Sequence, residues 1–217
     1  MKWRKVGTIP AKADPEQQAA FLKTKLQPRL RQAEQGKRTV FFVDAAHFIF
    51  GPFLGYLWCL VRCWIPGPSG RKRYNVLAAL NAVNHAIIRV ANHSYINAES
   101  VCLLLRQIAA AGLARPITLV LDNARYQRCE LVQSLARSLR IELLFLPSYS
   151  PNLNLIERLW KFLKKECLAC CPMSTYETFT QTIDVCLNNL HTKHKEEMRT
   201  LLTRNFQTFE NVPVLND

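Results

Sequence analysis

Short runs of apolar residues alternate along this chain with segments whose apolar positions recur at helical spacing. The runs 39–43, 117–121 and 141–146 are almost wholly apolar, which predicts buried strands. Segments 53–65 and 74–90 are rich in β-branched and aromatic residues, and a turn-rich basic stretch separates them. They predict two antiparallel strands joined by an exposed loop.

The second half of the chain changes to a helical period. Asn97 is placed to cap a helix whose apolar positions follow the i, i+3, i+4, i+7 spacing, and Gly112 is placed to end it. A second helical pattern separates the strands 117–121 and 141–146, and the tail from Ser174 onward also has helical character. A strand, helix, strand order with wholly apolar strands implies a parallel pair joined by a right-handed crossover. The prediction is an α/β fold with a mixed sheet, antiparallel first and then parallel with helical cover.

Domain organisation follows from a change in polarity near residue 36. Residues 14–36 are charged and helix-prone, with Pro28 interrupting, and they predict an arm or linker over residues 1–36. A core domain is expected over 37–171, with a C-terminal helical extension over 172–217. The longest uncharged apolar run is far shorter than the ~20 residues of a membrane-spanning helix. With no apolar stretch behind the basic N-terminus, we expect a cytoplasmic protein without a membrane partner.

Charge adds a candidate partner. The 217 residues contain 29 Lys and Arg against 16 Asp and Glu, a net charge of +13, which favours a polyanionic partner such as nucleic acid. The eight cysteines lie mostly in apolar segments, so we expect free, buried thiols rather than disulfides. A zinc site can also be drawn from the residues Cys167, Cys170, Cys171, His191 and His194, but the spacing between the pairs is longer than in the usual zinc finger.

Three acidic residues lie at positions in the predicted elements where active-site side chains are common. Asp44 and Asp122 each follow the apolar run of a predicted strand, and ligands of α/β sheets collect at such strand ends. Glu157 lies on a predicted helix that begins at Ser150 and Pro151, beside the buried seam. That seam consists of Leu153, Ile156, Trp160 and Leu163, and the neighbouring stripe consists of Asn154, Glu157, Lys161 and Lys164.

Carboxylate oxygens favour hard cations, so the three acids predict a site for two Mg²⁺ ions, with Mn²⁺ as the expected substitute. Two such ions bind both oxygens of an in-line phosphoryl displacement. Each acid taken alone also has a simpler interpretation. Asp44 and Asp122 are compatible with a strand end and a turn, and Glu157 with a surface pair to Lys161.

Four blocks of sequence resemble transposases of the mariner superfamily, in its bacterial insertion-sequence branch. They are VFFVDAAHF (40–48), PSGRKRYNVLAALNA (68–82), LVLDNARYQ (119–127) and LPSYSPNLNLIERLWKFLKK (146–165). The last block is the most specific. Glu157 follows Asp122 by 35 positions, and the family's third acid follows its second by a similar interval.

The resemblance implies a ribonuclease-H-like fold with a five-stranded mixed sheet. It implies that Asp44, Asp122 and Glu157 are the catalytic, metal-binding residues of a DDE transposase. The implied reaction is cleavage of transposon-end DNA, followed by attack of the freed 3′-hydroxyl on target DNA. Family members pair two ends as dimers and carry helix-turn-helix modules that read the ends. This chain begins in what resembles the linker after those modules, so a separate upstream product is one expected partner.

Basic residues near two of the acids are candidate DNA-backbone contacts. They are Arg125, Arg158, Lys161, Lys164 and Lys165, together with the loop residues Arg71, Lys72 and Arg73. His47 is compatible with facing the metals or with ordinary packing, and Gln127, where many relatives have His, cannot titrate. Two rival hypotheses stay open. One is a catalytically silent DNA-binding remnant or domesticated protein, and the other is a related metal-dependent nuclease that hydrolyses DNA without joining it.

Overall fold

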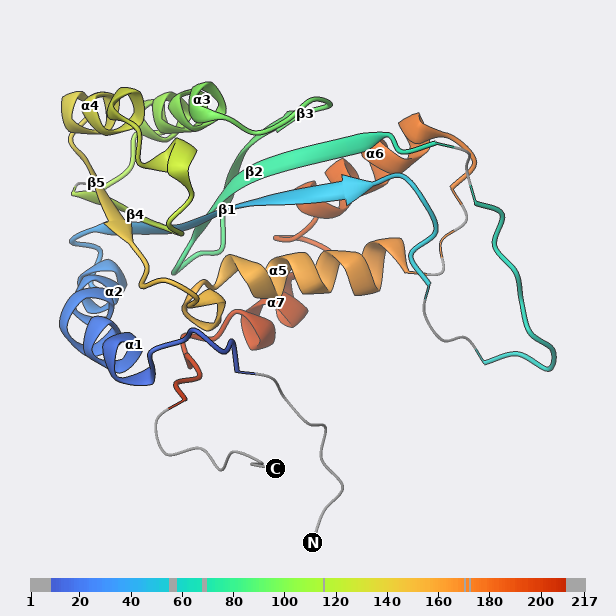
Figure 1. The fold of residues 1–217 in the computed structure, drawn as a ribbon, viewed down its shortest axis with the longest axis horizontal. Helices are drawn as coiled ribbons and strands as arrows, with labels where there is room; N and C mark the ends of the chain where they lie inside the picture. The colour runs from blue at the N-terminus through green and yellow to red at the C-terminus, as the bar shows by residue number, and fades with distance from the viewer. Residues whose placement is uncertain are drawn as a thin grey trace, which may run out of the picture.

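Five strands form one mixed sheet at the centre of the molecule (Figure 1). The computed structural model describes residues 9–54, 58–67, 70–114, 116–169, 171 and 173–209. The strands are β1 (Thr39–Ile49), β2 (Arg73–Asn81), β3 (Ile87–Asn92), β4 (Ile117–Leu121) and β5 (Ile141–Phe145), and their spatial order is β3-β2-β1-β4-β5. β1, β2 and β3 pair antiparallel, whereas β4 is parallel to both β1 and β5. The predicted mixed sheet is confirmed.

Three of the strand predictions were wrong, and the first two concern β1 and the segment 74–90. β1 does not end at Asp44 but continues to Ile49, because β2 pairs with it over that whole length. The predicted strand 74–90 is a hairpin of β2 and β3. Its turn is stabilised by the Asn81 side-chain oxygen, which accepts hydrogen bonds from the amides of Val83 and Asn84 at 2.9 and 3.1 Å.

The described residues of 53–65 form no strand, and residues 55–57 lie outside the described part. Trp58 and Leu60 in this segment are fully exposed, at 106% and 105% of their reference area. Only an isolated bridge between Phe53 and Ala169 was found there. β2 occupies the position next to β1 that this segment needed, so its apolar side chains have no sheet to pack on.

Helices cover both faces of the sheet (Figure 1). One face carries α3 (Ala98–Ala110) and α4 (Glu130–Ser138). The other carries α1 (Pro15–Phe21), the π-helical turn η1 (Leu22–Leu26), α2 (Gln27–Glu34), α5 (Ile156–Phe162), the π-helical segment η4 (Leu163–Leu168), α6 (Tyr176–Asn188) and α7 (Lys195–Leu201). Short 3₁₀ turns, η2 (Arg125–Gln127) and η3 (Pro151–Leu153), precede α4 and α5. No helix among these is long and apolar enough to cross a membrane.

The N-terminal helices pack on the core. Phe21, Leu26 and Leu30 are buried in the same apolar cluster as Phe42 of β1. Pro28, expected to interrupt the helix, does not end it. The helical backbone continues from α1 through η1 into α2, and the π-helical turn η1 lies directly before the residues that carry the proline. The expectation of an arm ahead of the core is therefore wrong for residues 15–34. The domain boundaries at 36 and 171 stay a prediction.

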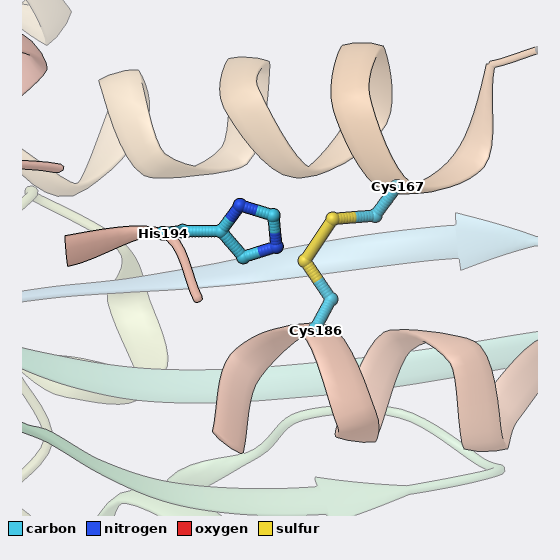
Figure 2. A group of neighbouring side chains, drawn as sticks. All are labelled: Cys167, Cys186 and His194. Atoms are coloured by element: carbon cyan, nitrogen blue, oxygen red, sulfur yellow. A yellow bond between two sulfur atoms is a disulfide. The ribbon is translucent and has the colours of Figure 1, made fainter. Parts of the chain in front are cut away.

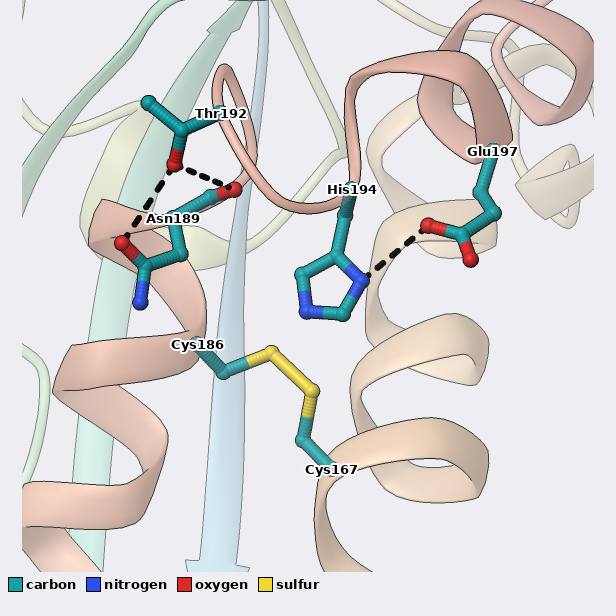
Figure 3. Close-up of a disulfide and its surroundings, with 6 residues drawn as sticks. All are labelled: Cys167, Cys186, Asn189, Thr192, His194 and Glu197. Atoms are coloured by element: carbon teal, nitrogen blue, oxygen red, sulfur yellow. Dashed lines mark hydrogen bonds and ion pairs between the residues drawn. A yellow bond between two sulfur atoms is a disulfide. The ribbon is translucent and has the colours of Figure 1, made fainter.

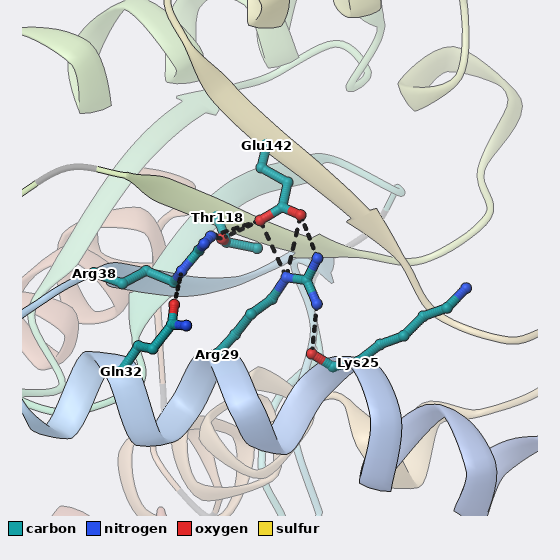
Figure 4. A network of polar contacts seen from close by, with 6 residues as sticks. All are labelled: Lys25, Arg29, Gln32, Arg38, Thr118 and Glu142. Carbon is teal, nitrogen blue, oxygen red and sulfur yellow. Dashed lines mark hydrogen bonds and ion pairs between the residues drawn. The ribbon is translucent and has the colours of Figure 1, made fainter.

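Glu142 of β5 holds the N-terminal helices on the sheet through charged hydrogen bonds (Figure 4). Its carboxylate accepts from Arg29 of α2, from Arg38 at 2.6 Å and from the Thr118 hydroxyl at 2.7 Å. These hydrogen bonds, with that of Arg29 the largest cause, lower the pKa of Glu142 from 4.5 to about 2. The network is partly exposed and joins three elements that are distant in sequence.

Glu142→Gln is expected to lower the free energy of unfolding at pH 7 by about 1–2 kcal/mol, because two arginines lose a charged acceptor. The native pKa lies below the unfolded value, so the stabilisation is present above pH 4.5 and is lost as the pH falls toward 2. Urea unfolding at pH 7 and pH 3 measures both effects. Glu130→Gln, which removes an exposed pair with Arg137, is the control and is expected to change little. Equal losses in the two variants would contradict the prediction.

One disulfide contradicts the expectation of free thiols. Cys167 in η4 and Cys186 in α6 are bonded, and the two helices that carry them pack against each other. The sequence separation of 19 residues hid this pair, because only the packing of α6 beneath the sheet brings Cys186 to Cys167. Cys102, Cys129 and Cys171 are not bonded and are at least partly buried, as expected.

Candidate active site

Asp44 and Asp122 lie in equivalent positions on neighbouring strands. The last residue pair between β1 and β4 is Phe42 with Val120, and each aspartate is two residues beyond its member of that pair. Side chains two residues apart along a strand point to the same face, and neighbouring strands are ~4.8 Å apart. Phe42 and Val120 both point to the face covered by α5. The two carboxylates therefore leave the sheet side by side, as the sequence predicted.

Glu157 comes from the first turn of α5. The predicted helix from Ser150 begins in two steps instead. A 3₁₀ turn covers Pro151–Leu153, and α5 starts at Ile156. The Ser150 hydroxyl makes no capping bond and donates to the Ser148 carbonyl at 3.2 Å. The seam itself is confirmed, since the side chains on it are at most 3% exposed: Leu153, Ile156, Trp160 and Leu163.

All three acids line one cavity of about 380 Å³. The other walls come from the loop after β4 and the loop after β5: Asn123, Ala124, Leu146, Pro147, Ser148, Tyr149, Ser150 and Pro151, with Asn154. Among these described lining residues there is no Lys, Arg or His to balance the negative charge. Burial, followed by the charges of Glu157 and Asp122, raises the pKa of Asp44 from 3.8 to about 7. The cavity is thus a site for positive charge.

Two residues that support the acids were assigned no such role from the sequence. Trp160, interpreted as core alone, donates its indole N–H to Asp44 Oδ2 at 2.9 Å and so orients that carboxylate. Asn154 is buried and donates to the Val43 carbonyl at 3.3 Å, just beyond the last β1–β4 pair. No partner of its amide oxygen was found among the described residues. In the sequence, the spacing of three residues between Asn154 and Glu157 placed both side chains on one face of the predicted helix.

The loop that forms the outer wall is supported by α1. Gln18, completely buried, donates to the carbonyl of Tyr149 at 3.3 Å and accepts from Asn152 at 2.9 Å. Tyr149 has a positive φ of 57° and is about half exposed at the cavity edge. The helix expected to be an arm therefore helps to shape the site.

Most of the predicted DNA contacts are exposed. Lys161 and Lys164 extend along α5 and η4 from Glu157, and Arg125 follows Ala124 at the cavity edge. Lys165 forms an ion pair with its neighbour Glu166 at 2.6 Å. The loop residues Arg71, Lys72 and Arg73 precede and begin β2, and are exposed.

Arg158 is not available for DNA in this structure. Its guanidinium donates to the carbonyls of Leu201, Thr203 and Asn205 at 3.2, 2.6 and 2.6 Å. Burial lowers its pKa. The end of α7 lies against α5, and this side chain satisfies the carbonyls there, so the phosphate contact of Arg158 stays a prediction that the structure does not favour.

His47 and Gln127 lie away from the acids. His47 is an odd number of residues from Asp44 along β1, so it points to the opposite face. Its Nδ1 lies 2.7 Å from the Asn75 side-chain oxygen, which supports the packing interpretation. Gln127 is fully buried and does not line the cavity.

Comparison with known proteins shows the family to which this chain belongs. The model of the DDE superfamily endonuclease family matches residues 62–180. The chain is 29% identical over 127 residues to an uncharacterized 39 kDa protein of insertion element IS630 from Shigella sonnei. That match covers 57% of this chain and 37% of the Shigella protein, so the chain spans well under half of that relative.

Solved structures of the Mos1 mariner transposase have the same fold. The catalytic domain superposes with a TM-score of 0.56 at 13% identity, over 91% of this chain and 94% of that one. A strand transfer complex and a paired-end complex with Mg each superpose with a TM-score of 0.62, at 18% and 16% identity, over 96% of this chain and 68% of theirs. The ribonuclease-H-like fold predicted from the sequence is confirmed.

Proposed function

The chain belongs to the DDE superfamily of endonucleases, and from this membership we propose that it cleaves transposon-end DNA and joins the freed 3′-hydroxyl to target DNA. At the level of the family, the chain is a DDE transposase catalytic domain. The choice of transposon ends and target as substrates, and the joining step, are the proposal. The Mos1 complexes, named for paired ends and for strand transfer, support it.

The observation that carries the proposal is the uncompensated charge of the cavity. Three carboxylates from separate parts of the chain line it, and its described lining contains no basic residue. Burial and like charge raise the pKa of Asp44, so the arrangement is unfavourable without a cation. Oxygen donors suit Mg²⁺ and Mn²⁺, and a Mos1 complex was solved with Mg. The residues present fit a divalent metal site.

We assign Asp44, Asp122 and Glu157 as ligands of two Mg²⁺ ions, which supply Lewis-acid stabilisation of the attacking and leaving oxygens. The chain's own contribution is to place the ligands. Trp160 fixes the Asp44 carboxylate through its indole N–H, and the Ala124 amide donates to Asp122 Oδ1 at 3.3 Å. Glu157 is held by the buried seam of its helix.

A covalent enzyme intermediate is not part of the proposal. Ser148 and Ser150 line the cavity. Neither has a histidine or lysine in the described cavity lining that would act as its base. The nucleophiles are therefore water for cleavage and the DNA 3′-hydroxyl for joining.

Lys161 and Lys164 are proposed to hold the DNA backbone beside the acids. The double variant Lys161→Gln, Lys164→Gln is expected to weaken DNA binding and to reduce the slope of log K against log salt by up to about 2, since each phosphate contact contributes ~0.9. Fluorescence anisotropy between about 50 and 200 mM salt measures the slope.

Lys37→Gln is the control. Lys37 is exposed and lies just before the first residue of β1, whereas Asp44 and Asp122 lie beyond the opposite end of the β1–β4 pairing. An unchanged slope in the double variant, or an equal change in the control, would remove these lysines from the interface. We propose contacts with the DNA backbone also for Arg125, Arg71, Lys72, Arg73 and Lys165.

Joined products separate transposition from hydrolysis alone. The chain is incubated with Mg²⁺, a labelled duplex ending in the inverted repeat that flanks its gene, and a supercoiled target plasmid. The proposal expects label covalently attached to the plasmid. Nicked duplex without joined product would favour a nuclease, and salt-sensitive binding without nicking would favour a silent DNA-binding protein. Helix-turn-helix modules supplied by a partner and a dimer that pairs two ends are further proposals from the family.

A further inference from the structure

A second cluster of metal-binding side chains lies beneath the sheet, away from the three acids. Cys167 lies near the end of η4, which continues the helix that carries Glu157. Cys186 belongs to α6, and His194 immediately precedes α7 (Figure 2). The ligand atoms of these three residues all lie within 4.8 Å of one another. Cys186 is buried, and the other two are half-buried. Three separate segments of the C-terminal part of the chain therefore bring two sulfurs and an imidazole together.

The imidazole is already oriented as in a metal site. His194 Nδ1 lies 3.1 Å from a Glu197 carboxylate oxygen, and the ring extends from there toward the disulfide (Figure 3). With Nδ1 used by the carboxylate, the other ring nitrogen faces the sulfurs (Figure 2). A carboxylate that fixes the far nitrogen of a ligating histidine is the usual outer-sphere arrangement around zinc.

We propose that the reduced chain binds one Zn²⁺ through the thiolates of Cys167 and Cys186 and the free ring nitrogen of His194. Two thiolates and one imidazole form a set that favours zinc over Mg²⁺. Thiolates at ~2.3 Å from a tetrahedral zinc are ~3.8 Å apart, so the sulfurs must separate from their bonded position. The Cα atoms are 6.4 Å apart, which leaves that movement to side-chain rotation.

The site is accessible to an ion and to a fourth ligand. Cys167, Cys186 and His194 line a cavity of about 430 Å³ together with residues that include Glu166, Asn189 and Lys193. Three protein ligands leave one position of a tetrahedral zinc for water. The zinc site considered from the sequence consisted of Cys167, Cys170, Cys171, His191 and His194, and only Cys167 and His194 belong to the site proposed here. His191 is exposed, Cys170 lies outside the described residues, and Cys186 was not included.

Zinc binding and the disulfide exclude each other. A thiol reductant passes two electrons and two protons to the Cys167–Cys186 bond, which gives two protein thiols and one reductant disulfide. Zinc then replaces the two thiol protons, which are released to solvent. Either state ties the helix that carries Glu157 to α6, whereas the metal-free dithiol does not. The oxidation state of the solution thus decides which link is present.

Zinc counting on the whole chain tests the proposal. The protein is reduced with a phosphine, loaded with ZnCl₂ in millimolar Mg²⁺ to occupy oxygen sites, and desalted, and its zinc is measured by mass spectrometry. We expect about one zinc per reduced chain and almost none in a chain whose disulfide is confirmed by intact mass. Cobalt in place of zinc is expected to give a thiolate-to-metal charge-transfer band. No zinc on the reduced chain, or equal zinc on both forms, would overturn the proposal.

Variants identify the ligands. Cys167→Ser and Cys186→Ser are expected to lose the zinc and the cobalt band, His194→Asn to weaken binding at least tenfold, and Glu197→Gln about tenfold. Two controls are expected to keep the zinc. Cys63→Ser removes an exposed thiol, and Asp44→Asn alters the acidic cavity. Melting curves show that each variant is folded. Loss of zinc in either control with retention in the cysteine variants would place the ion elsewhere.

Discussion

Asp44→Asn, Asp122→Asn and Glu157→Gln are each expected to lower Mg²⁺-dependent nicking of transposon-end DNA by about a thousandfold or more. Each change keeps the size of the side chain but removes a negative charge from the cavity that all three residues line. Loss of one group that stabilises the charge of a transition state costs ~10²–10³ in rate, and a lost metal ligand also weakens metal binding. Single-turnover nicking of a labelled end duplex measures the loss.

The control is Glu130→Gln. Glu130 is an exposed carboxylate that pairs with Arg137 and does not line the acidic cavity. Its variant is expected to nick at the rate of the unchanged chain, and circular dichroism is expected to show the same fold for all four variants. Nicking by Asp122→Asn at the unchanged rate would remove Asp122 from the mechanism, and the same test applies to the other two acids.

Asp44→Asn is also expected to stabilise the metal-free chain at pH 8, by on the order of 3 kcal/mol. The folded pKa of Asp44, about 7, lies above its ordinary value of 3.8. Between these values the folded chain keeps a proton that the unfolded chain has lost, so this group lowers stability as the pH rises from about 4 to 7. Above pH 7 the whole of this loss in the free energy of unfolding remains.

Urea unfolding in a chelator at pH 4 and pH 8 measures the difference between the variant and the unchanged chain. The difference is expected to be near zero at pH 4 and large at pH 8, and added Mg²⁺ is expected to reduce it at pH 8. Asp14→Asn is the control, because Asp14 caps α1 at an exposed position and Asn caps equally well. The same gain at both pH values would show that Asp44 is not under electrostatic strain.

The sheet and the acids were predictable because both depend on local pattern. The segments 117–121 and 141–146 are apolar apart from Thr118 and Glu142, because helices cover most of their side chains. The structure has β4 and β5 there, with a difference of one residue at the end of β5. Asp44 and Asp122 each follow the apolar run of one of two adjacent parallel strands, so burial and register together place them side by side. The segment 53–65 failed because β propensity alone does not tell whether a strand has a neighbour.

By itself the sequence determined the alternation of strands and helices, the buried seam of α5 and the three acids, since burial and period are properties of neighbouring residues. The tertiary structure alone decided four features: the indole of Trp160 on Asp44, the use of Arg158 as a cap for α7, the support of the cavity wall by Gln18, and the meeting of Cys167 with Cys186 and His194. Each joins elements whose approach depends on how whole helices pack on the sheet. No local pattern carries that information, because these contacts form only after the apolar faces have been buried.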